Sequence, residues 1–207
     1  NFSVSLIAPE GVAIGPFQEN MGSQRYRASG TELLIYYGEP SPYSLVQEIY
    51  MDFLPVENYI DSGIWKIRLT PEKITEGRYD LWLPAREERN QDTYFYRPDP
   101  DTTLTIPSTA GKVISVGAYD SRLMTYASFS GRGYTRDGRN IKPDLSAPGV
   151  NIMTTAPGGG YAPRTGTSFA TPFVSGSAAL LMQWGLIDGR DPYLYGSKLK
   201  AYLLKGA

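Results

Sequence analysis

Hydrophobic and polar residues alternate along much of the first hundred residues. In residues 2–6 the hydrophobic side chains stand at every second position and two serines separate them, as on a strand with one buried face. Proline, glycine and aspartate turn signals recur at intervals of roughly 10–20 residues, as they do in a β-sandwich. The pattern therefore predicts an all-β first unit. Its other strand-like runs are residues 31–37, 45–54, 63–70 and 77–83.

The second half of the chain has a different pattern. Residues 112–119 form a β-branched run, which is typical of a buried strand in a mostly parallel sheet. Residues 150–155 predict a short strand, and residues 198–205 predict a short amphipathic helix. Residues 170–184 are apolar or small nearly all round, which predicts a buried helix. These elements together predict a mixed α/β unit.

Charge divides the chain in the same way. Residues 1–100 carry 15 acidic and 9 basic side chains, whereas residues 101–207 carry 6 acidic and 11 basic ones. The stretch 97–101 (Arg-Pro-Asp-Pro-Asp) is typical of a rigid linker. We therefore expect two domains, 1–97 and 98–207.

Composition excludes several classes of partner. The chain of 207 residues is 41% hydrophobic but has no long apolar run, so no membrane span is predicted. A net charge of −1 gives no indication of nucleic-acid binding. The chain has no cysteine, and its scattered acids Asp52, Glu57 and Asp61 do not follow a calcium-loop pattern, so neither a metal nor a cofactor is expected. It also has no histidine.

The candidate chemistry lies in residues 166–172, Gly-Thr-Ser-Phe-Ala-Thr-Pro. Glycine permits a close backbone approach, and the Thr-Ser pair offers oxygens that can cap a helix. Pro172 is tolerated only near the start of that helix. Ser168 is thus placed at a helix N-terminus, where free N–H groups and the helix dipole can stabilise an oxyanion. The residue types alone leave two roles open for Ser168, a helix cap and a nucleophile.

This stretch resembles the nucleophile signature Gly-Thr-Ser-x-Ala-x-Pro of the subtilisin-like serine proteases. The resemblance extends to residues 113–118, 126–130 and 142–150, in the family's order, and covers residues 104–184. It implies that Ser168 is the catalytic nucleophile and that its backbone N–H forms part of the oxyanion hole. It also implies that the preceding residues bind substrate, namely Arg164, Thr165, Gly166 and Thr167.

Two other residues are assigned from the same resemblance. Asp144 matches the family's structural Pro-Asp-x-x-Ala-Pro-Gly turn, not the aspartate of the catalytic triad. Phe169 stands where many members carry methionine, and its ring either crowds the leaving-group side of the site or packs in the core.

A narrower resemblance comes from the first unit. About a hundred residues precede the strand at 113–116, as in the germination subtilases of spore-forming bacteria, which carry a jelly-roll inserted at this point. Residues 77–84 and 105–110 are also similar to those proteins. The resemblance implies a jelly-roll-like β-sandwich followed by the C-terminal part of an α/β subtilisin-like domain with a mostly parallel sheet. It implies a secreted, cell-envelope or spore-associated location.

The family's remaining catalytic groups are missing from these residues. In the family the triad aspartate and histidine and the oxyanion asparagine precede the insertion, and no Gly-Asn-x-Gly sequence occurs here. We therefore expect a C-terminal fragment of a serine endopeptidase that hydrolyses protein substrates through an acyl-enzyme on Ser168. The fragment alone is expected to be inactive, and its partner is the N-terminal half of the domain or a swapped copy. Two alternatives remain, an inactive pseudoprotease that acts in signalling or protein binding, and a protein- or carbohydrate-binding role of the acidic sandwich.

Overall fold

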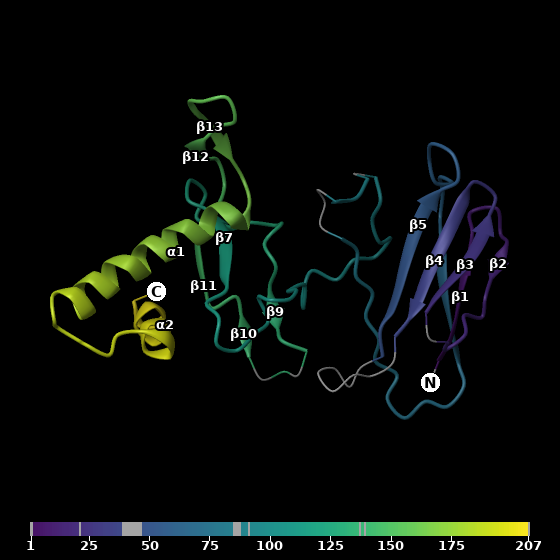
Figure 1. Ribbon diagram of the computed structural model, residues 1–207, viewed down its shortest axis with the longest axis horizontal. Helices are drawn as coiled ribbons and strands as arrows, with labels where there is room; N and C mark the ends of the chain where they lie inside the picture. Colours follow the sequence, from purple (N-terminus) through teal and green to yellow (C-terminus); the bar gives the residue numbers. More distant parts are fainter. Residues whose placement is uncertain are drawn as a thin grey trace. The chain divides into compact units, whose positions relative to one another are not determined.

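The chain forms two compact units, Asn1–Trp82 and Leu83–Ala207, drawn in Figure 1. The computed structural model describes residues 2–20, 22–38, 47–84, 88–90, 92–136, 138 and 140–206. The sequence predicted the boundary between the two domains near residues 97–103, whereas the boundary between the two compact units falls between Trp82 and Leu83. The described residues between strands β6 (Lys66–Pro71) and β7 (Val116–Asp120) form no strand or α-helix. No regular element therefore marks the end of the first unit.

The described residues of the first unit form two three-stranded sheets, and every pairing in them is antiparallel. The strand order is β2-β1-β6 in one sheet and β3-β4-β5 in the other. The strands are β1 (Phe2–Ile7), β2 (Ala13–Ile14), β3 (Ser23–Ala28), β4 (Thr31–Tyr37), β5 (Ile49–Pro55) and β6 (Lys66–Pro71).

A hydrophobic core joins the two sheets of this unit. Leu6 from β1 and Leu33 and Ile35 from β4 are fully buried in one cluster. Along β4 the buried positions alternate with half-buried ones, because successive side chains of a strand point to opposite faces. In β1, Val4 and Leu6 of the alternating pattern are buried, as the sequence predicted for a strand with one buried face.

Two of the predicted strand runs differ from the structure. Residues 77–83 form no strand, and Tyr79, Leu81 and Trp82 are exposed. Hydrophobic and polar residues alternate in this segment, but it pairs with no other strand. Without a partner strand, the hydrogen bonds that define a β-strand cannot form. Of the run 45–54, residues 45 and 46 lie outside the described residues, and β5 begins at Ile49.

Where the structure describes it, the second unit consists of a three-stranded sheet, two two-stranded hairpins and a helical C-terminal part. The sheet has the order β11-β7-β8, in which β11 pairs with β7 in parallel and β8 pairs with β7 antiparallel. This is the one parallel pairing among the strands of the described ranges, so the predicted mostly parallel sheet is not confirmed. The strands are β7 (Val116–Asp120), β8 (Thr125–Tyr126), β9 (Gly133–Tyr134), β10 (Ile141–Lys142), β11 (Leu145–Pro148), β12 (Ile152–Thr155) and β13 (Tyr161–Arg164).

The helices follow in the order α1 (Thr167–Met182), a short π-helix (Gln183–Ile187) and α2 (Gly196–Lys205). Helix α1 packs on β7 and β11 through small side chains. The buried cluster at this contact consists of Ala118, Ala127, Ala147, Ala170 and Val174. None of the helices described is long and apolar enough to cross a bilayer.

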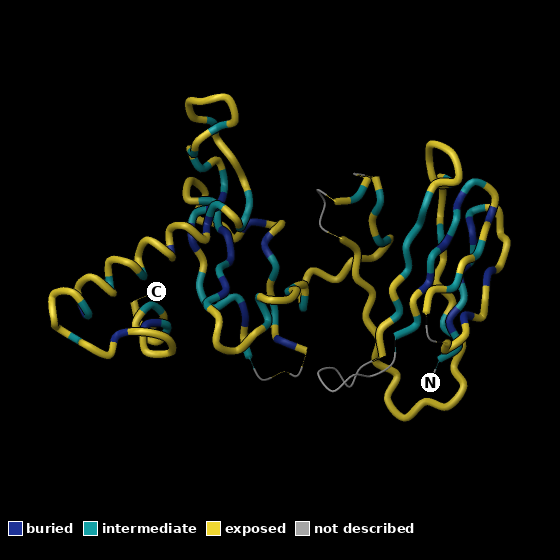
Figure 2. Tube along the Cα trace, in the orientation of Figure 1, coloured by how far each residue is buried: buried dark blue, intermediate teal, exposed yellow. Residues whose placement is uncertain are grey.

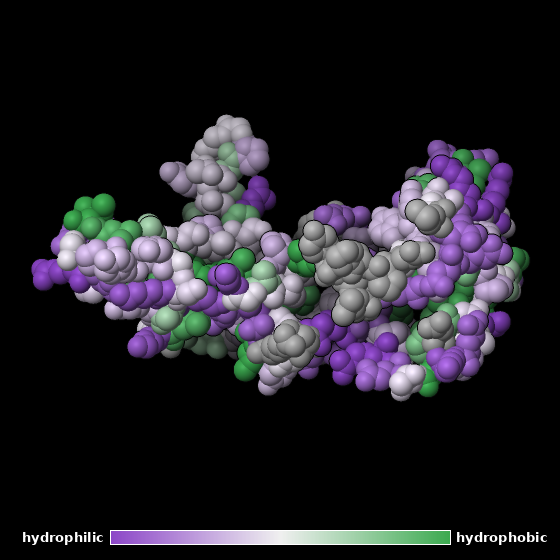
Figure 3. Space-filling model, turned by 60° about the horizontal axis from the view of Figure 1, so that its bottom comes forward, coloured by the Kyte–Doolittle hydropathy of each residue, from purple (hydrophilic) through white to green (hydrophobic). Residues whose placement is uncertain are grey.

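The prediction that α1 is buried nearly all round is wrong for this chain. Only Ala170 and Val174 of the helix are buried, while Phe173 and Leu180 are 47% and 69% exposed. Figure 2 shows most of α1 in the colour of exposed residues. The sheet and α2 contact one side of the helix, whereas Phe173 and Leu180 are largely exposed. Figure 3 shows hydrophobic residues, drawn in green, on the surface of the molecule.

Candidate active site

The N-terminus of α1 is fixed at the end of the parallel strand pair. The N–H of Gly166 donates to the carbonyl of Gly149 at 2.8 Å, and the N–H of Gly149 donates to the carbonyl of Tyr119 at 3.0 Å. Gly149 directly follows β11, and Tyr119 belongs to β7. Ser168, the second residue of α1, is exposed beside this junction.

Two glycines permit this close approach. A Cβ atom on Gly149 would lie 2.6 Å from the Ala118 Cβ and 3.0 Å from the Gly166 carbonyl oxygen, which is too close for any side chain. Gly166 has φ of 156°, in the left-handed half of the map that residues with side chains avoid. The glycine that opens the motif is therefore required by the backbone itself.

Ser168 does not cap the helix, contrary to one of its two predicted roles. Gly166 is the N-cap residue and no side chain makes a capping hydrogen bond; the N–H of Phe169 donates to the Gly166 carbonyl at 3.1 Å. Within the described ranges, neither the hydroxyl nor the N–H of Ser168 has a hydrogen-bond partner. An uncommitted hydroxyl and an uncommitted N–H thus lie together at the positive end of a helix dipole. A nucleophile with an oxyanion donor needs this arrangement.

An open hollow of about 310 Å³ is lined by Phe169, the residue that follows Ser168. It lies between β12 and the first turns of α1, and its lining residues are Ile152, Met153, Thr154, Phe169, Pro172 and Phe173. Phe169 is half-buried and lines this hollow, and it does not belong to the core cluster beneath α1. Of its two predicted roles, the structure therefore favours the one beside the site.

The four residues before Ser168 have different environments. Arg164 ends β13 and is exposed. The Thr165 hydroxyl accepts a hydrogen bond from the Asn151 N–H at 3.0 Å, so this side chain holds the strand β13 to the loop before β12. Gly166 and Thr167 are half-buried, and the Thr167 carbonyl accepts from the Thr171 hydroxyl at 3.1 Å. Arg164 is thus the member of this group whose side chain is free to contact a ligand.

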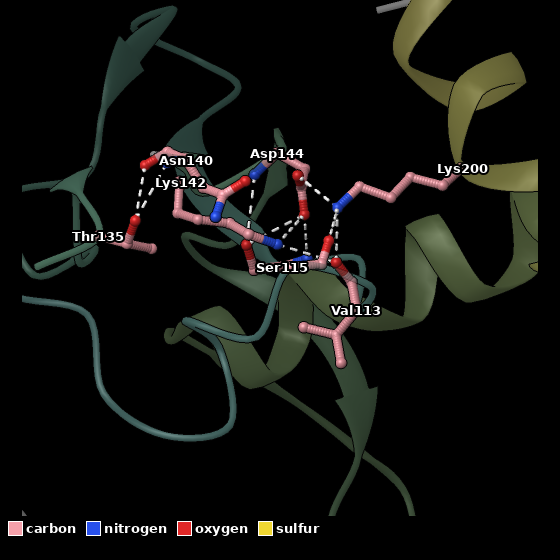
Figure 4. Close-up of polar contacts among 8 residues, drawn as sticks. Val113, Ser115, Thr135, Asn140, Lys142, Asp144 and Lys200 are labelled. Atoms are coloured by element: carbon pink, nitrogen blue, oxygen red, sulfur yellow. Dashed lines mark hydrogen bonds and ion pairs between the residues drawn. The ribbon is translucent and has the colours of Figure 1, made fainter. Parts of the chain in front are cut away.

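Asp144 belongs to a buried ion cluster (Figure 4). Its carboxylate is 2.7 Å from the Lys142 ammonium and 2.8 Å from the Lys200 ammonium, and it accepts a hydrogen bond from the Ser115 N–H at 2.8 Å. The side chains of Asp144 and Lys142 are only 8% and 1% exposed. Both lysines also donate to the Val113 carbonyl. The cluster therefore ties α2 to the strands on which α1 packs.

The electrostatics of the cluster follow from this geometry. Burial alone would raise the pKa of Asp144, but hydrogen bonds from Lys142, Lys200 and Ser115 outweigh it and hold the pKa below its usual range. Burial lowers the pKa of the Lys142 ammonium, partly offset by its hydrogen bond to Asp144. Asp144 is therefore charged at neutral pH, and its carboxylate is bound by Lys142, Lys200 and Ser115.

Asp144 is also in the wrong place to orient a base at Ser168. It immediately precedes β11, whereas Gly149, which contacts the N-terminus of α1, immediately follows that strand. A strand of this length separates the two ends by about 15 Å. This agrees with the structural role predicted for Asp144. The sequence did not identify its partner Lys200, because no local pattern links a lysine of α2 to this turn.

Comparison with known proteins decides the family. The sequence model of the Subtilase family matches residues 90–207, which is more than half of the chain. The chain belongs to the subtilase family. Ser168 and the Gly149–Gly166 contact lie within the matched part of this subtilase.

Part of this subtilase is similar in sequence to characterised serine proteases. The serine protease AprX of Bacillus subtilis is 37% identical over 128 residues, which are 52% of this chain and 27% of that protein. Subtilisin E of the same species is 42% identical over 81 residues, covering 39% of this chain and 19% of subtilisin E. The subtilase chain thus spans about a quarter or less of the length of these relatives.

A solved structure resembles both units of the subtilase. The CspB protease of Clostridium perfringens matches 100% of this chain with a TM-score of 0.85 and 39% sequence identity, and the match covers 43% of that protein. Because the match includes residues before position 90, the similarity extends beyond the residues that match the family model.

Proposed function

We propose that this chain is the nucleophile-bearing part of a serine endopeptidase of the subtilisin type. Ser168 attacks the carbonyl carbon of a peptide bond in a protein substrate and forms an acyl-enzyme, which water then hydrolyses. The observation that carries the proposal is the uncommitted hydroxyl and N–H of Ser168 at the N-terminus of α1, within a family signature. Residues Arg164, Thr165, Gly166 and Thr167 flank the bound peptide.

The general base comes from a segment outside these residues. Deprotonating a serine hydroxyl near neutral pH needs a group such as imidazole, and the 207 residues contain no histidine. Relatives in which the matched region is 43% or less of the protein support such a segment. It supplies the triad histidine and aspartate and the side-chain donor of the oxyanion hole.

The same segment covers the apolar side of α1. Phe173, Leu180 and Ile187 are exposed on the helix and on the π-helix that continues it. Exposed apolar residues in such a group mark an interface. The occupant is the N-terminal half of the protease domain, in the same chain or in a swapped copy.

The first unit is a jelly-roll-like domain inserted into the protease. Two antiparallel sheets with one shared core support a β-sandwich, and the similarity to CspB over the whole chain supports the insertion. We assign residues 1–97 to the inserted domain and residues 98–207 to the C-terminal part of the protease domain. The compact part of the insertion ends at Trp82.

Hydrolysis of casein or of a fluorogenic peptide tests the proposal. The longer protein that includes the upstream segment is expected to turn the substrate over, and the purified 207-residue chain is not. Turnover by the 207-residue chain that disappears in Ser168→Ala would contradict our account of the base. Failure of the longer protein to cleave any substrate would favour a pseudoprotease, the alternative that the missing histidine keeps open.

A further inference from the structure

Arg164 carries a charge that nothing in the described part of the chain balances. Some basic residues of the second unit are paired: Arg132 with Asp101, Lys142 and Lys200 with Asp144, and Lys198 with Asp191. By contrast, the structure gives the Arg164 guanidinium no ion pair or hydrogen bond within the described ranges. An exposed arginine is often only solvated, so its position decides whether it has a role.

The strand register places Arg164 on the face of its hairpin that adjoins the hollow. Arg164 on β13 pairs with Ile152 on β12, and paired residues of an antiparallel ladder project to the same face. Ile152 and Thr154, on that face, line the hollow and are half-buried; Met153 between them is 65% exposed and also lines the hollow. Arg164 therefore lies directly across the ladder from Ile152, a residue that lines the hollow, and four residues before Ser168.

The hollow itself offers nothing that would neutralise this charge. Its lining consists of isoleucine, methionine, threonine, proline and two phenylalanines, and the first turn of α1 has no acidic residue. The positive end of the α1 dipole faces the same region. A ligand in this place would contact the Arg164 guanidinium, the N-terminus of α1 and apolar side chains. These surroundings favour a carboxylate carried on a short aliphatic side chain.

We infer that Arg164 selects protein substrates with an aspartate or glutamate within two residues of the scissile bond. The inference rests on the proposed function and adds the substrate class to it. The guanidinium fork donates two parallel hydrogen bonds to the carboxylate of that side chain, and the aliphatic carbons of the substrate side chain lie along the hollow. A neutral side chain at the same substrate position does not form this ion pair with Arg164 and therefore binds more weakly.

The test uses peptide pairs that differ only in Glu or Gln at each of the two positions on either side of the cleaved bond. In the longer protein, kcat/KM is expected to be about tenfold higher for the Glu peptide at one of these positions, as a charge-assisted hydrogen bond gives. Arg164→Gln is expected to remove this preference while the Gln peptide is still cleaved. Arg164→Lys keeps the charge without the fork and is expected to keep part of the preference.

Arg190→Gln is the matched control. Arg190 is also an exposed arginine, but it follows the far end of α1, a 16-residue helix about 24 Å long. This variant is expected to keep the full preference for Glu. Added salt should reduce the preference in the unmodified protein, because ion pairs near the surface are screened.

The outcomes separate the inference from the proposed function. Cleavage with no preference for Glu at any position, or a preference that survives Arg164→Gln, overturns the inference and leaves the protease intact. If no peptide is cleaved, the proposed function fails, and peptide binding to the Ser168→Ala protein then decides. Tighter binding of a Glu peptide that Arg164→Gln abolishes supports the role of Arg164 as an acidic-peptide site, and equal binding of both peptides overturns it.

Discussion

Replacing Ser168 with alanine in the longer protein is expected to lower kcat for peptide hydrolysis by about 10⁶-fold. Triad residues act as a unit, and loss of the nucleophile removes acyl-enzyme formation altogether, leaving only the contribution of binding and of the oxyanion donors. The thermal unfolding temperature is expected to stay within about 1 °C of the original, because the Ser168 hydroxyl makes no hydrogen bond within the described residues.

Ser175→Ala provides the control for this prediction. Ser175 is an exposed serine of the same helix, and its substitution removes the same atom without touching the motif. Its kcat is expected to stay close to that of the unmodified protein. A Ser168→Ala protein that retains a tenth or more of the original kcat would contradict the assignment of the nucleophile.

Replacing Asp144 with asparagine is expected to lower the free energy of unfolding of the second unit by about 3 kcal/mol. The substitution leaves the Lys142 and Lys200 ammonium groups close together and buried without their counter-charge. Urea unfolding followed by the helical circular dichroism signal measures this, because both α-helices described belong to the second unit. The control is Asp101→Asn, which breaks the exposed pair with Arg132 and is expected to have little effect. An equally small effect of Asp144→Asn would show that the cluster does not hold α2 in place.

The same substitution gives a pH signature. The pKa of Asp144 is lowered in the folded protein from its ordinary value of 3.8, so between the two values the unfolded chain binds more protons. The stability that Asp144 contributes is therefore complete above pH 3.8 and is lost as the pH falls through the folded pKa. The difference in unfolding free energy between the unmodified protein and Asp144→Asn is expected to shrink below that pH. A difference that stays constant down to pH 2 would contradict the ion cluster.

Local sequence patterns predicted local structure well. Alternation located β1, the strand-like run 31–37 matches β4, and the motif around Gly166 placed Ser168 in the first turn of a helix, because these features depend on neighbouring residues. Of the two roles left open for Ser168, the structure does not show the helix cap: a Thr-Ser pair offers capping oxygens, yet Gly166, which contacts Gly149, is the N-cap residue. Side-chain propensity was overridden there by a backbone contact.

Features that depend on distant residues were not predictable. The alternation at residues 77–83 resembled that of β1, but only the fold decides whether a partner strand is present. The apolar character of α1 predicted burial, although several of its apolar residues, Phe173 and Leu180 among them, are exposed. The pairing of Lys200 with Asp144 likewise depends on how α2 docks. In each case the local pattern describes what a segment can do, and tertiary contacts decide the outcome.

The central claim is that Ser168 is the nucleophile of a subtilisin-type acyl transfer, and covalent labelling tests it most directly. The longer protein is treated with a phosphonylating probe that reacts with activated serines, and the adduct is located by peptide mass spectrometry. We predict a single adduct on Ser168, which is absent from the unfolded protein because activation depends on the assembled site. An adduct on another serine, or hydrolysis of casein that continues with Ser168 unlabelled at full probe occupancy, would contradict the claim.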